Sequence, residues 1–261
     1  MSEPFPRPRL GVGAFPQRRY PKAPIIEAII SLNVEMPPGF DVKQFRQIIS
    51  GPETGYTEHG EERMAAFTAS PLTGVSAQEP VITGFRFISG DGKYVLGCRT
   101  SSFSLSRLAP YENWELFRDE ARSLWAVFRD KFMPTKVTSL SVRYINRIEI
   151  PWKIGQQIDF KWYFRTFPEV SSDLDVGMDG FIMRLDIPLG EIGARLILNQ
   201  ARLPPASPIP ESLSVLLDSD IVTGLEVSDE SAIWERCEIL RQAKNNIFEA
   251  CITNLTRELF E

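Results

Sequence analysis

An aromatic stripe runs along one predicted helix and requires a second layer to cover it. Between residues 114 and 132, apolar side chains recur at steps of three and four, namely Trp114, Phe117, Ala121, Leu124, Trp125, Phe128 and Phe132. This spacing predicts an amphipathic helix of about five turns, and Pro134 ends it because proline cannot continue a helix. Such stripes are typical of cores, so we expect Trp114 and this helix to have a structural role against a sheet.

The segments before this helix alternate with the period of a strand. Residues 25–36 place Ile26, Ala28, Ile30, Leu32 and Val34 on one face, which predicts a strand with one buried side. A short helix is expected over 41–49, with Asp41 as its N-cap. Residues 51–80 are mixed, with a strand near 64–69. Further strands are predicted over 81–89, 94–99 and 102–108.

The same order of elements returns in the second half. Strands are expected over 140–150, 180–187, 193–199 and 213–217, with a short aromatic helix over 159–167. A last helix is expected from the N-cap Ser228 to Leu259. Each half therefore follows a β-α-β(n)-α order, which predicts a duplicated α+β fold. We expect a largely antiparallel sheet with two long helices on one face, an arrangement reminiscent of the TATA-box-binding-protein fold in architecture only.

This pattern predicts three parts of the chain. They are a basic, proline-rich arm over 1–24, a first α+β repeat over 25–136, and a second repeat over 137–261, with the two repeats sharing one sheet. The arm carries five basic residues (Arg7, Arg9, Arg18, Arg19 and Lys22) against Glu3, so the rest of the chain is net acidic. The arm either docks on an acidic partner or on nucleic acid, or it lies solvated across the domain. The acidic body argues against broad, non-specific DNA binding.

Composition narrows the class of protein. Apolar residues make up 43% and charged residues 24% of 261 residues, which excludes disorder as the main state. No apolar run approaches the length of a membrane helix, and no secretory signal is present. The three cysteines, Cys98, Cys237 and Cys251, are odd in number and widely spaced. We therefore expect buried free thiols in a cytoplasmic protein that has no membrane partner.

Alternation gathers arginines on the sheet face that points away from the helices. Glu27, Glu35, Glu149 and Asp186 share that face with Arg86, Arg99, Arg143, Arg147, Arg184 and Arg195. The planar guanidinium fork suits carboxylates and phosphates, so this face is a candidate binding surface for an anion, a nucleic-acid strand or an acidic partner segment. The alternative is a set of cross-strand arginine–carboxylate pairs that solvate an open sheet.

Other candidate residues favour structural roles. Asn146 interrupts an apolar strand face beside Tyr144, so its amide must find hydrogen-bond partners in the core. Asp218 and Asp220 are expected at a strand end, where they either hold a divalent metal or form a turn; the sequence favours the turn. His59 is the only histidine, and it lies in the least regular segment. We predict no metal, no cofactor and no catalytic residue.

Several stretches together resemble one family. In order they are residues 24–28 (Pro-Ile-Ile-Glu-Ala), 84–89 (Gly-Phe-Arg-Phe-Ile-Ser), 107–114 (Arg-Leu-Ala-Pro-Tyr-Glu-Asn-Trp), 143–148 (Arg-Tyr-Ile-Asn-Arg-Ile), 217–220 (Leu-Asp-Ser-Asp) and 246–250 (Asn-Ile-Phe-Glu-Ala). They are similar to the TIGR04255 family, whose members are sporadically distributed prokaryotic proteins without an established activity. The resemblance implies no catalytic residues, and the patchy distribution fits a mobile or defence-associated gene.

Three functions remain open on these observations. The leading hypothesis is a non-enzymatic protein-interaction module, as in a prokaryotic defence or toxin–antitoxin-like system. It would bind a protein partner through the arginine-bearing face or the basic arm. The first alternative is a nucleic-acid-binding regulator, and the second is an enzyme or binder for an anionic small molecule near Arg143 and Arg147. The sequence favours the non-enzymatic hypothesis because no nucleophile, acid cluster or metal motif stands out. An open sheet edge is also compatible with a homodimer.

Overall fold

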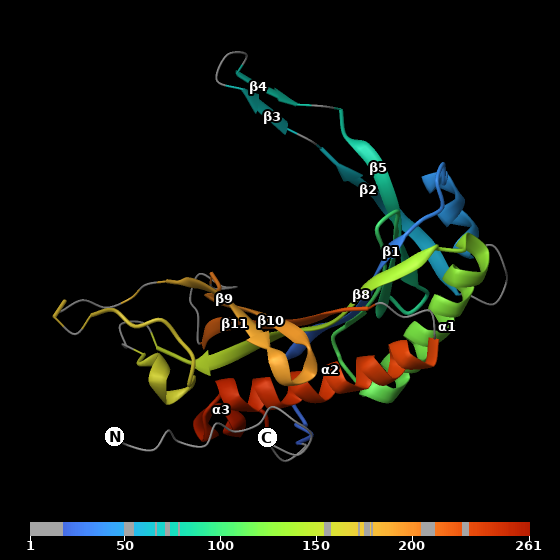
Figure 1. Cartoon of the computed structure of the whole chain (residues 1–261). Helices are drawn as coiled ribbons and strands as arrows, with labels where there is room; N and C mark the ends of the chain where they lie inside the picture. The colour runs from blue at the N-terminus through green and yellow to red at the C-terminus, as the bar shows by residue number, and fades with distance from the viewer. Residues whose placement is uncertain are drawn as a thin grey trace. The chain divides into compact units, whose positions relative to one another are not determined.

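The fold is α+β, as the sequence predicts. A computed structural model of the chain describes residues 18–49, 55–65, 67–70, 74–77, 79–153, 158–171, 173–174, 178, 180–204, 212–225 and 230–261. Nine strands form a large antiparallel sheet in the order β2-β5-β6-β7-β1-β8-β11-β10-β9 (Figure 1). The duplication expected of the two halves stays a prediction.

The elements have the following bounds. The large sheet contains β1 (Ile25–Glu35), β2 (Tyr56–Met64), β5 (Val81–Ser89), β6 (Tyr94–Arg99), β7 (Ser102–Leu108), β8 (Lys136–Pro151), β9 (Ile182–Leu189), β10 (Ala194–Arg202) and β11 (Ser212–Gly224). A two-stranded sheet contains β3 (Phe67–Ser70) and β4 (Gly74–Ala77). The helices are α1 (Trp114–Phe132), α2 (Glu230–Cys251) and α3 (Asn254–Glu258), and the 3-10 segments are η1 (Val42–Ile49), η2 (Phe160–Trp162) and η3 (Gly190–Ile192).

The chain divides into two compact units. The α2 unit holds the described residues of 18–28, 141–224 and 231–261, and the α1 unit holds those of 29–140 and 225–230. The repeat boundaries expected from the sequence pattern, 25–136 and 137–261, stay a prediction.

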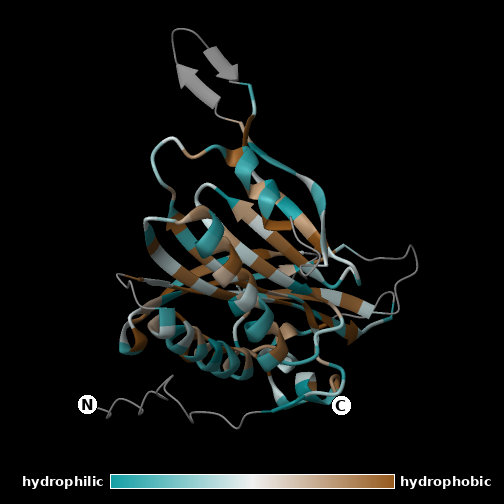
Figure 2. Cartoon of the chain, turned by 90° about the vertical axis from the view of Figure 1, so that its right-hand side faces the viewer, coloured by the Kyte–Doolittle hydropathy of each residue, from teal (hydrophilic) through white to brown (hydrophobic). Residues whose placement is uncertain are grey.

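The α1 unit has an aromatic core, as the stripe predicts. All seven stripe residues, Trp114 included, are buried. The rings of Trp125 and Phe128 contact Phe103 of β7, each at a centroid distance of 5.5 Å. The side chain of Asn113 caps the start of α1, and Met133 ends the helix in the left-handed region with φ 46°. Apolar and polar bands alternate along the strands that carry this core (Figure 2).

In the α2 unit, one long helix covers one face of the sheet. The strands β9, β10 and β11 pair antiparallel, and α2 lies along one side of them (Figure 1). Cys237, Leu240 and Ile247 of α2 are buried, and so are Tyr144 and Ile148 of β8. Because these buried side chains lie on the side of the sheet that α2 covers, the opposite face of the same strands points away from α2.

Two predicted helices are wrong in this unit. The helix expected over 159–167 is only the single turn η2, and the helix expected to reach Leu259 ends at Cys251 before α3 begins. The reason is one long-range pairing: Phe164 and Ile252 form an isolated antiparallel bridge. This bridge takes backbone groups that both helices would need, and Thr253 then caps α3. The predicted N-cap Ser228 lies outside the described residues.

The strand β11 is longer than predicted, and this changes the position of two acidic residues. The expected strand ended at residue 217, whereas β11 continues to Gly224. Asp218 and Asp220 therefore lie within a central strand and not at a strand end. The prediction was wrong because these polar residues interrupt the apolar pattern. The Asp218 carboxylate forms an ion pair with Arg143 of the neighbouring strand β8 instead of ending the ladder.

The remaining predicted elements in the α1 unit are mostly found. The strand expected near 64–69 is instead β2 followed by β3, and the expected helix over 41–49 is the 3-10 segment η1. All three cysteines are free and buried, as predicted. Within the described ranges, no helix is long and apolar enough to cross a membrane.

Candidate functional site

The six predicted arginines fall on strands of both units. Arg143 and Arg147 lie on β8, Arg184 on β9 and Arg195 on β10, all in the α2 unit, whereas Arg86 on β5 and Arg99 on β6 belong to the α1 unit. In the α2 unit, we define the open face as the side of the sheet away from α2. It carries Arg143, Arg147, Glu149, Arg184, Asp186, Arg195, Asn199, Ser214, Asp218 and Asp220.

The centre of the open face is a bidentate ion pair between β8 and β11. Arg143 Nε donates to Asp218 Oδ1 at 2.8 Å, and Arg143 Nη2 donates to Oδ2 at 2.7 Å. Asn199 of β10 donates to the same Oδ2 at 3.0 Å. Hydrogen bonding to Asp218 raises the pKa of Arg143, although burial opposes it. Three strands are thus linked by one buried carboxylate, and the guanidinium fork is occupied.

Asp220 lies beside this pair and is poorly compensated. Its Oδ1 atom is buried and has no hydrogen-bond partner among the described residues. Burial raises the pKa of the Asp220 carboxyl, while Arg143 and a hydrogen bond with Ser141 act in the opposite direction. Asp220 is therefore an incompletely satisfied polar group on the open face. Sequence reasoning missed this position because the sequence pattern places Asp220 at a strand end.

A second cluster on the open face links β8 to the start of β11. Arg147 Nε lies 2.5 Å from Glu149 Oε1, and Arg147 Nη2 donates to Ser214 Oγ at 2.9 Å. The hydroxyls of Ser212 and Ser214 donate to Glu149 at 2.7 Å. Burial acts to raise the pKa of Glu149, but hydrogen bonds from Ser212, Ser214 and Arg147 outweigh it and lower the pKa. This arginine, too, is occupied by a carboxylate of the chain.

The outer strand β9 has a free edge. The amide of Arg202 donates to the carbonyl of Phe181 at 3.1 Å, so these two residues form a hydrogen-bonded pair. Because such pairs alternate along an antiparallel ladder, Ile182, Arg184 and Asp186 direct their backbone groups away from β10. β9 is the last strand of the sheet, and no other strand of the described chain pairs with this edge.

The side chains of this edge form an exposed pattern on the open face. Ile182 is 90% exposed. Arg184 Nε and Asp186 Oδ2 form an ion pair at 3.2 Å, with both side chains about half exposed. Arg195, on the neighbouring strand, is exposed and has no ion-pair partner among the described residues. The edge therefore combines free backbone groups with one protruding apolar side chain.

In the α1 unit, the two predicted arginines share one carboxylate. Arg99 donates through Nε and Nη2 to Glu62 of β2, the latter at 2.8 Å, and through Nη1 to Ser104 at 3.2 Å. Arg86 lies 3.6 Å from Glu62. These contacts tie β2 to β5, β6 and β7. Neither guanidinium presents an empty fork.

The open face is close to electrically balanced. Its four guanidinium groups are accompanied by Glu149, Asp186, Asp218 and Asp220, and Glu27 of β1 also raises the pKa of Arg143. A surface that binds nucleic acid needs an excess of basic groups. The arrangement thus agrees with the second interpretation of these arginines, in which they form cross-strand pairs with carboxylates and do not bind a ligand.

The helix-facing side of the same strands holds buried polar residues. Asn146 is 2% exposed and donates to the carbonyl of Leu217 at 3.1 Å. The ammonium of Lys244 on α2 lies 3.6 Å from the ring centroid of Tyr144. Desolvation lowers the pKa of Lys244 to about 7. Sequence reasoning missed Lys244, because one lysine on a long helix carries no signal of burial.

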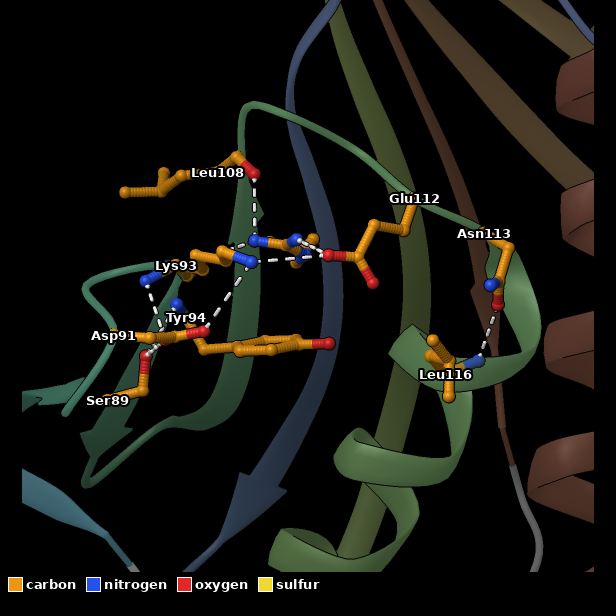
Figure 3. Close-up of polar contacts among 9 residues, drawn as sticks. Ser89, Asp91, Lys93, Tyr94, Leu108, Glu112, Asn113 and Leu116 are labelled. Atoms are coloured by element: carbon orange, nitrogen blue, oxygen red, sulfur yellow. Dashed lines mark hydrogen bonds and ion pairs between the residues drawn. The ribbon is translucent and has the colours of Figure 1, made fainter.

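The motif at residues 107–114 organises the connection from β7 to α1. Arg107, only 2% exposed, donates to the carbonyls of Lys93 and Leu108 and to Glu112 Oε1, the last at 3.0 Å (Figure 3). Its guanidinium also stacks over the ring of Tyr94 at 4.9 Å. Asn113 then caps the helix by accepting from the amide of Leu116. These contacts give the motif a structural role at the connection from β7 to α1.

The remaining candidates divide by position. Arg7 and Arg9 of the basic arm lie outside the described residues, whereas Arg18 and Arg19 are exposed. No group of three or more histidine, cysteine or acidic residues in the described ranges has the geometry of a metal site.

No family model matches the chain, and no curated protein matches it at a significant level. The resemblance to the TIGR04255 family, with the defence-associated setting it implies, stays a prediction.

Proposed function

We propose that this protein is a non-enzymatic recognition module that binds an extended segment of a partner protein along the free edge of β9. The observation that carries the proposal is this edge itself. Ile182, Arg184 and Asp186 direct their backbone groups outward, and Ile182 is 90% exposed. A partner strand that pairs there gains main-chain hydrogen bonds, and alternate side chains provide specificity.

The side-chain pattern of the edge defines the partner's chemistry. An apolar residue of the partner strand would cover Ile182, because a side chain so exposed gains most from removal from water. An acidic residue opposite Arg184 and a basic residue opposite Asp186 would continue the charge pattern across the new pair of strands. The expected partner segment is therefore extended and mixed in charge.

The arginine contacts favour this function over the two alternatives. Arg143 and Arg147 are each engaged by a carboxylate of the chain, so an incoming phosphate or small anion would have to displace an existing ion pair. The accompanying carboxylates also repel a nucleic-acid backbone. The three buried free thiols agree with a reducing compartment, and we therefore propose a cytoplasmic partner.

The test is affinity purification of the tagged full chain from its native cells, with and without nuclease, followed by mass spectrometry. Two variants disable the edge: Ile182→Asp removes the apolar anchor, and Arg184→Pro removes an outward N–H group that the native ladder does not use. Leu116→Asp is the matched control, since Leu116 is an exposed apolar residue on α1 at 53% exposure. Circular dichroism and thermal unfolding verify that each variant is folded.

The outcomes separate the hypotheses. A partner that resists nuclease, is lost in both edge variants and persists in Leu116→Asp supports the proposal. A partner retained by both edge variants overturns it. Nucleic acid that co-purifies and disappears with nuclease would move the regulator hypothesis to first place. A second, differently tagged copy of this chain, captured only through an intact edge, would identify the partner as the protein itself.

A further inference from the structure

An aromatic pocket lies in the α2 unit, and its lining residue Phe160 contacts Phe181, just before β9, at a ring-centroid distance of 5.2 Å. The pocket has a volume of about 1200 Å³ and includes, among its lining residues, Trp162, Tyr163, Phe167, Pro168, Glu169 and Leu255. Trp162 is 63% exposed, which is unusual for the largest apolar side chain. We call this feature the aromatic pocket.

The backbone beneath the pocket is held firmly. The hydroxyls of Thr253 and Thr256 donate to the carbonyls of Trp162 and Tyr163, respectively. The amide of Thr253 donates to the carbonyl of Tyr163 at 3.0 Å, and Phe164 pairs with Ile252. A segment fixed by this many bonds that nevertheless presents an exposed tryptophan has the form of a binding hot spot on a rigid support.

The lining indicates the chemistry of the occupant. Aromatic side chains beside proline form the surfaces on which polyproline II segments dock. Asp159 pairs with Lys161 at 2.6 Å, and the hydrogen bond from Lys161 lowers the pKa of Asp159. Glu169 also lines the pocket, so the lining has one more acidic group than basic groups. A proline-rich segment with arginines complements both properties.

The chain itself carries one segment of this chemistry, and its attachment point lies next to the pocket. Residues 4–9 read Pro-Phe-Pro-Arg-Pro-Arg. The described part of the arm begins at Arg18, and Tyr20 anchors it, since its ring contacts Phe260 at 5.3 Å and its hydroxyl donates to Glu249. Phe260 lies two residues after the end of α3, and Leu255 of α3 lines the pocket.

The length of the arm permits the connection. Residues 1–17 would span about 50 Å in a polyproline II conformation, whereas the five residues of α3 extend only about 7 Å. We propose that the aromatic pocket is the receptor for residues 4–9 of this chain, with Trp162 as the central contact. This inference concerns a different surface from the β9 edge and does not depend on the proposed function.

The test measures acrylamide quenching of Trp162 fluorescence. Of the five tryptophans, Trp114, Trp125 and Trp234 are buried at 5%, 2% and 6% exposure. Trp152 is partly exposed and Trp162 is 63% exposed, so the emission of Trp162 has to be separated from that of Trp152. The full chain is compared with a chain lacking residues 2–17 and with a full chain in which Pro4, Pro6 and Pro8 are replaced by alanine. A Trp162→Phe counterpart of each gives the contribution of Trp162 by difference, and thermal unfolding verifies folding.

We expect Trp162 to be quenched about twofold faster in the deletion chain and in the alanine chain than in the full chain, because docking removes its ring from solvent. A labelled peptide of residues 2–17 should bind the deletion chain saturably and the full chain weakly. Trp162→Ala should weaken that binding about tenfold or more. Equal quenching of Trp162 in all three chains overturns the proposal. Equal peptide binding by the full and deletion chains also overturns it, because the pocket would then be open to a partner's segment.

Discussion

The carboxylate of Asp218 accepts both hydrogen bonds of the Arg143 fork, at 2.8 and 2.7 Å, from a position that is only 3% exposed. The third bond, from Asn199, comes from the strand on the other side. A buried carboxylate with three charge-assisted or amide bonds is well compensated, so removing its charge leaves several donors without an acceptor. This pair is the main polar link between β8, β11 and β10.

Replacing Asp218 with asparagine should therefore destabilise the protein by about 1–3 kcal/mol, allowing for the partial exposure of Arg143. Urea unfolding followed by circular dichroism measures the loss. The matched control is Asp186→Asn, whose ion pair with Arg184 is exposed on both sides and should change stability by no more than about 0.5 kcal/mol. Equal losses in the two variants would contradict the assignment of Asp218 as the central link.

Asp220→Asn is expected to have the opposite effect from Asp218→Asn at neutral pH. Burial raises the pKa of Asp220 in the folded protein, so the folded state binds the proton more tightly than the unfolded state. Stability is therefore lost as the pH rises above the unfolded pKa of about 3.9. The asparagine variant lacks this loss and should be as stable as the wild type or more stable at pH 7. Its advantage should shrink toward pH 4 in urea titrations. A variant that is less stable at pH 7 would show that the Asp220 charge is compensated.

Lys244 should produce a pH dependence of the other sign. Desolvation lowers its pKa to about 7 in the folded protein, and the unfolded value is about 10.4. Above pH 7 the unfolded chain binds more protons, so the free energy of unfolding should rise with pH. Measurements between about pH 7 and 7.5 stay about one pH unit below the titration of unfolded cysteines. Lys244→Met should flatten this slope, and the same slope in the variant would rule out Lys244 as its source.

The elements that the sequence predicts best are those with a strong one-sided pattern. The helix Trp114–Phe132 is confirmed, because its apolar stripe and the proline that ends it lie within the same segment. The strands β5, β6 and β7 have the predicted bounds for the same reason. Alternation also placed Arg143 and Arg147 on strand faces where they contact carboxylates.

The errors occur where distant backbone groups decide the structure. The break between α2 and α3 depends on the pairing of Phe164 with Ile252, and nothing near Ile252 in the sequence signals that partner. The end of β11 was misplaced because Asp218 and Asp220 resemble turn residues unless Arg143 is known to lie opposite. The burial of Lys244 similarly depends on the ring of Tyr144, which lies a hundred positions earlier.

Arg107 provides a test of whether the motif at residues 107–114 acts through structure. Its buried guanidinium donates hydrogen bonds to two carbonyls and to Glu112, and lysine cannot reproduce this planar set of donors. Arg107→Lys should therefore destabilise the protein by about 2–4 kcal/mol. Glu112→Gln should cost only about 1 kcal/mol, because the Glu112 side chain is 46% exposed.

Urea unfolding gives both values, and Lys93→Ala is the control. It keeps the carbonyl that Arg107 uses (Figure 3) and removes an exposed ion pair with Glu112 at 3.3 Å. That control should leave stability within about 0.5 kcal/mol of the wild type. Full stability in Arg107→Lys would show that the fork is dispensable for the β7–α1 connection. The motif would then need an explanation other than folding, and partner binding by Arg107→Lys would be the next measurement.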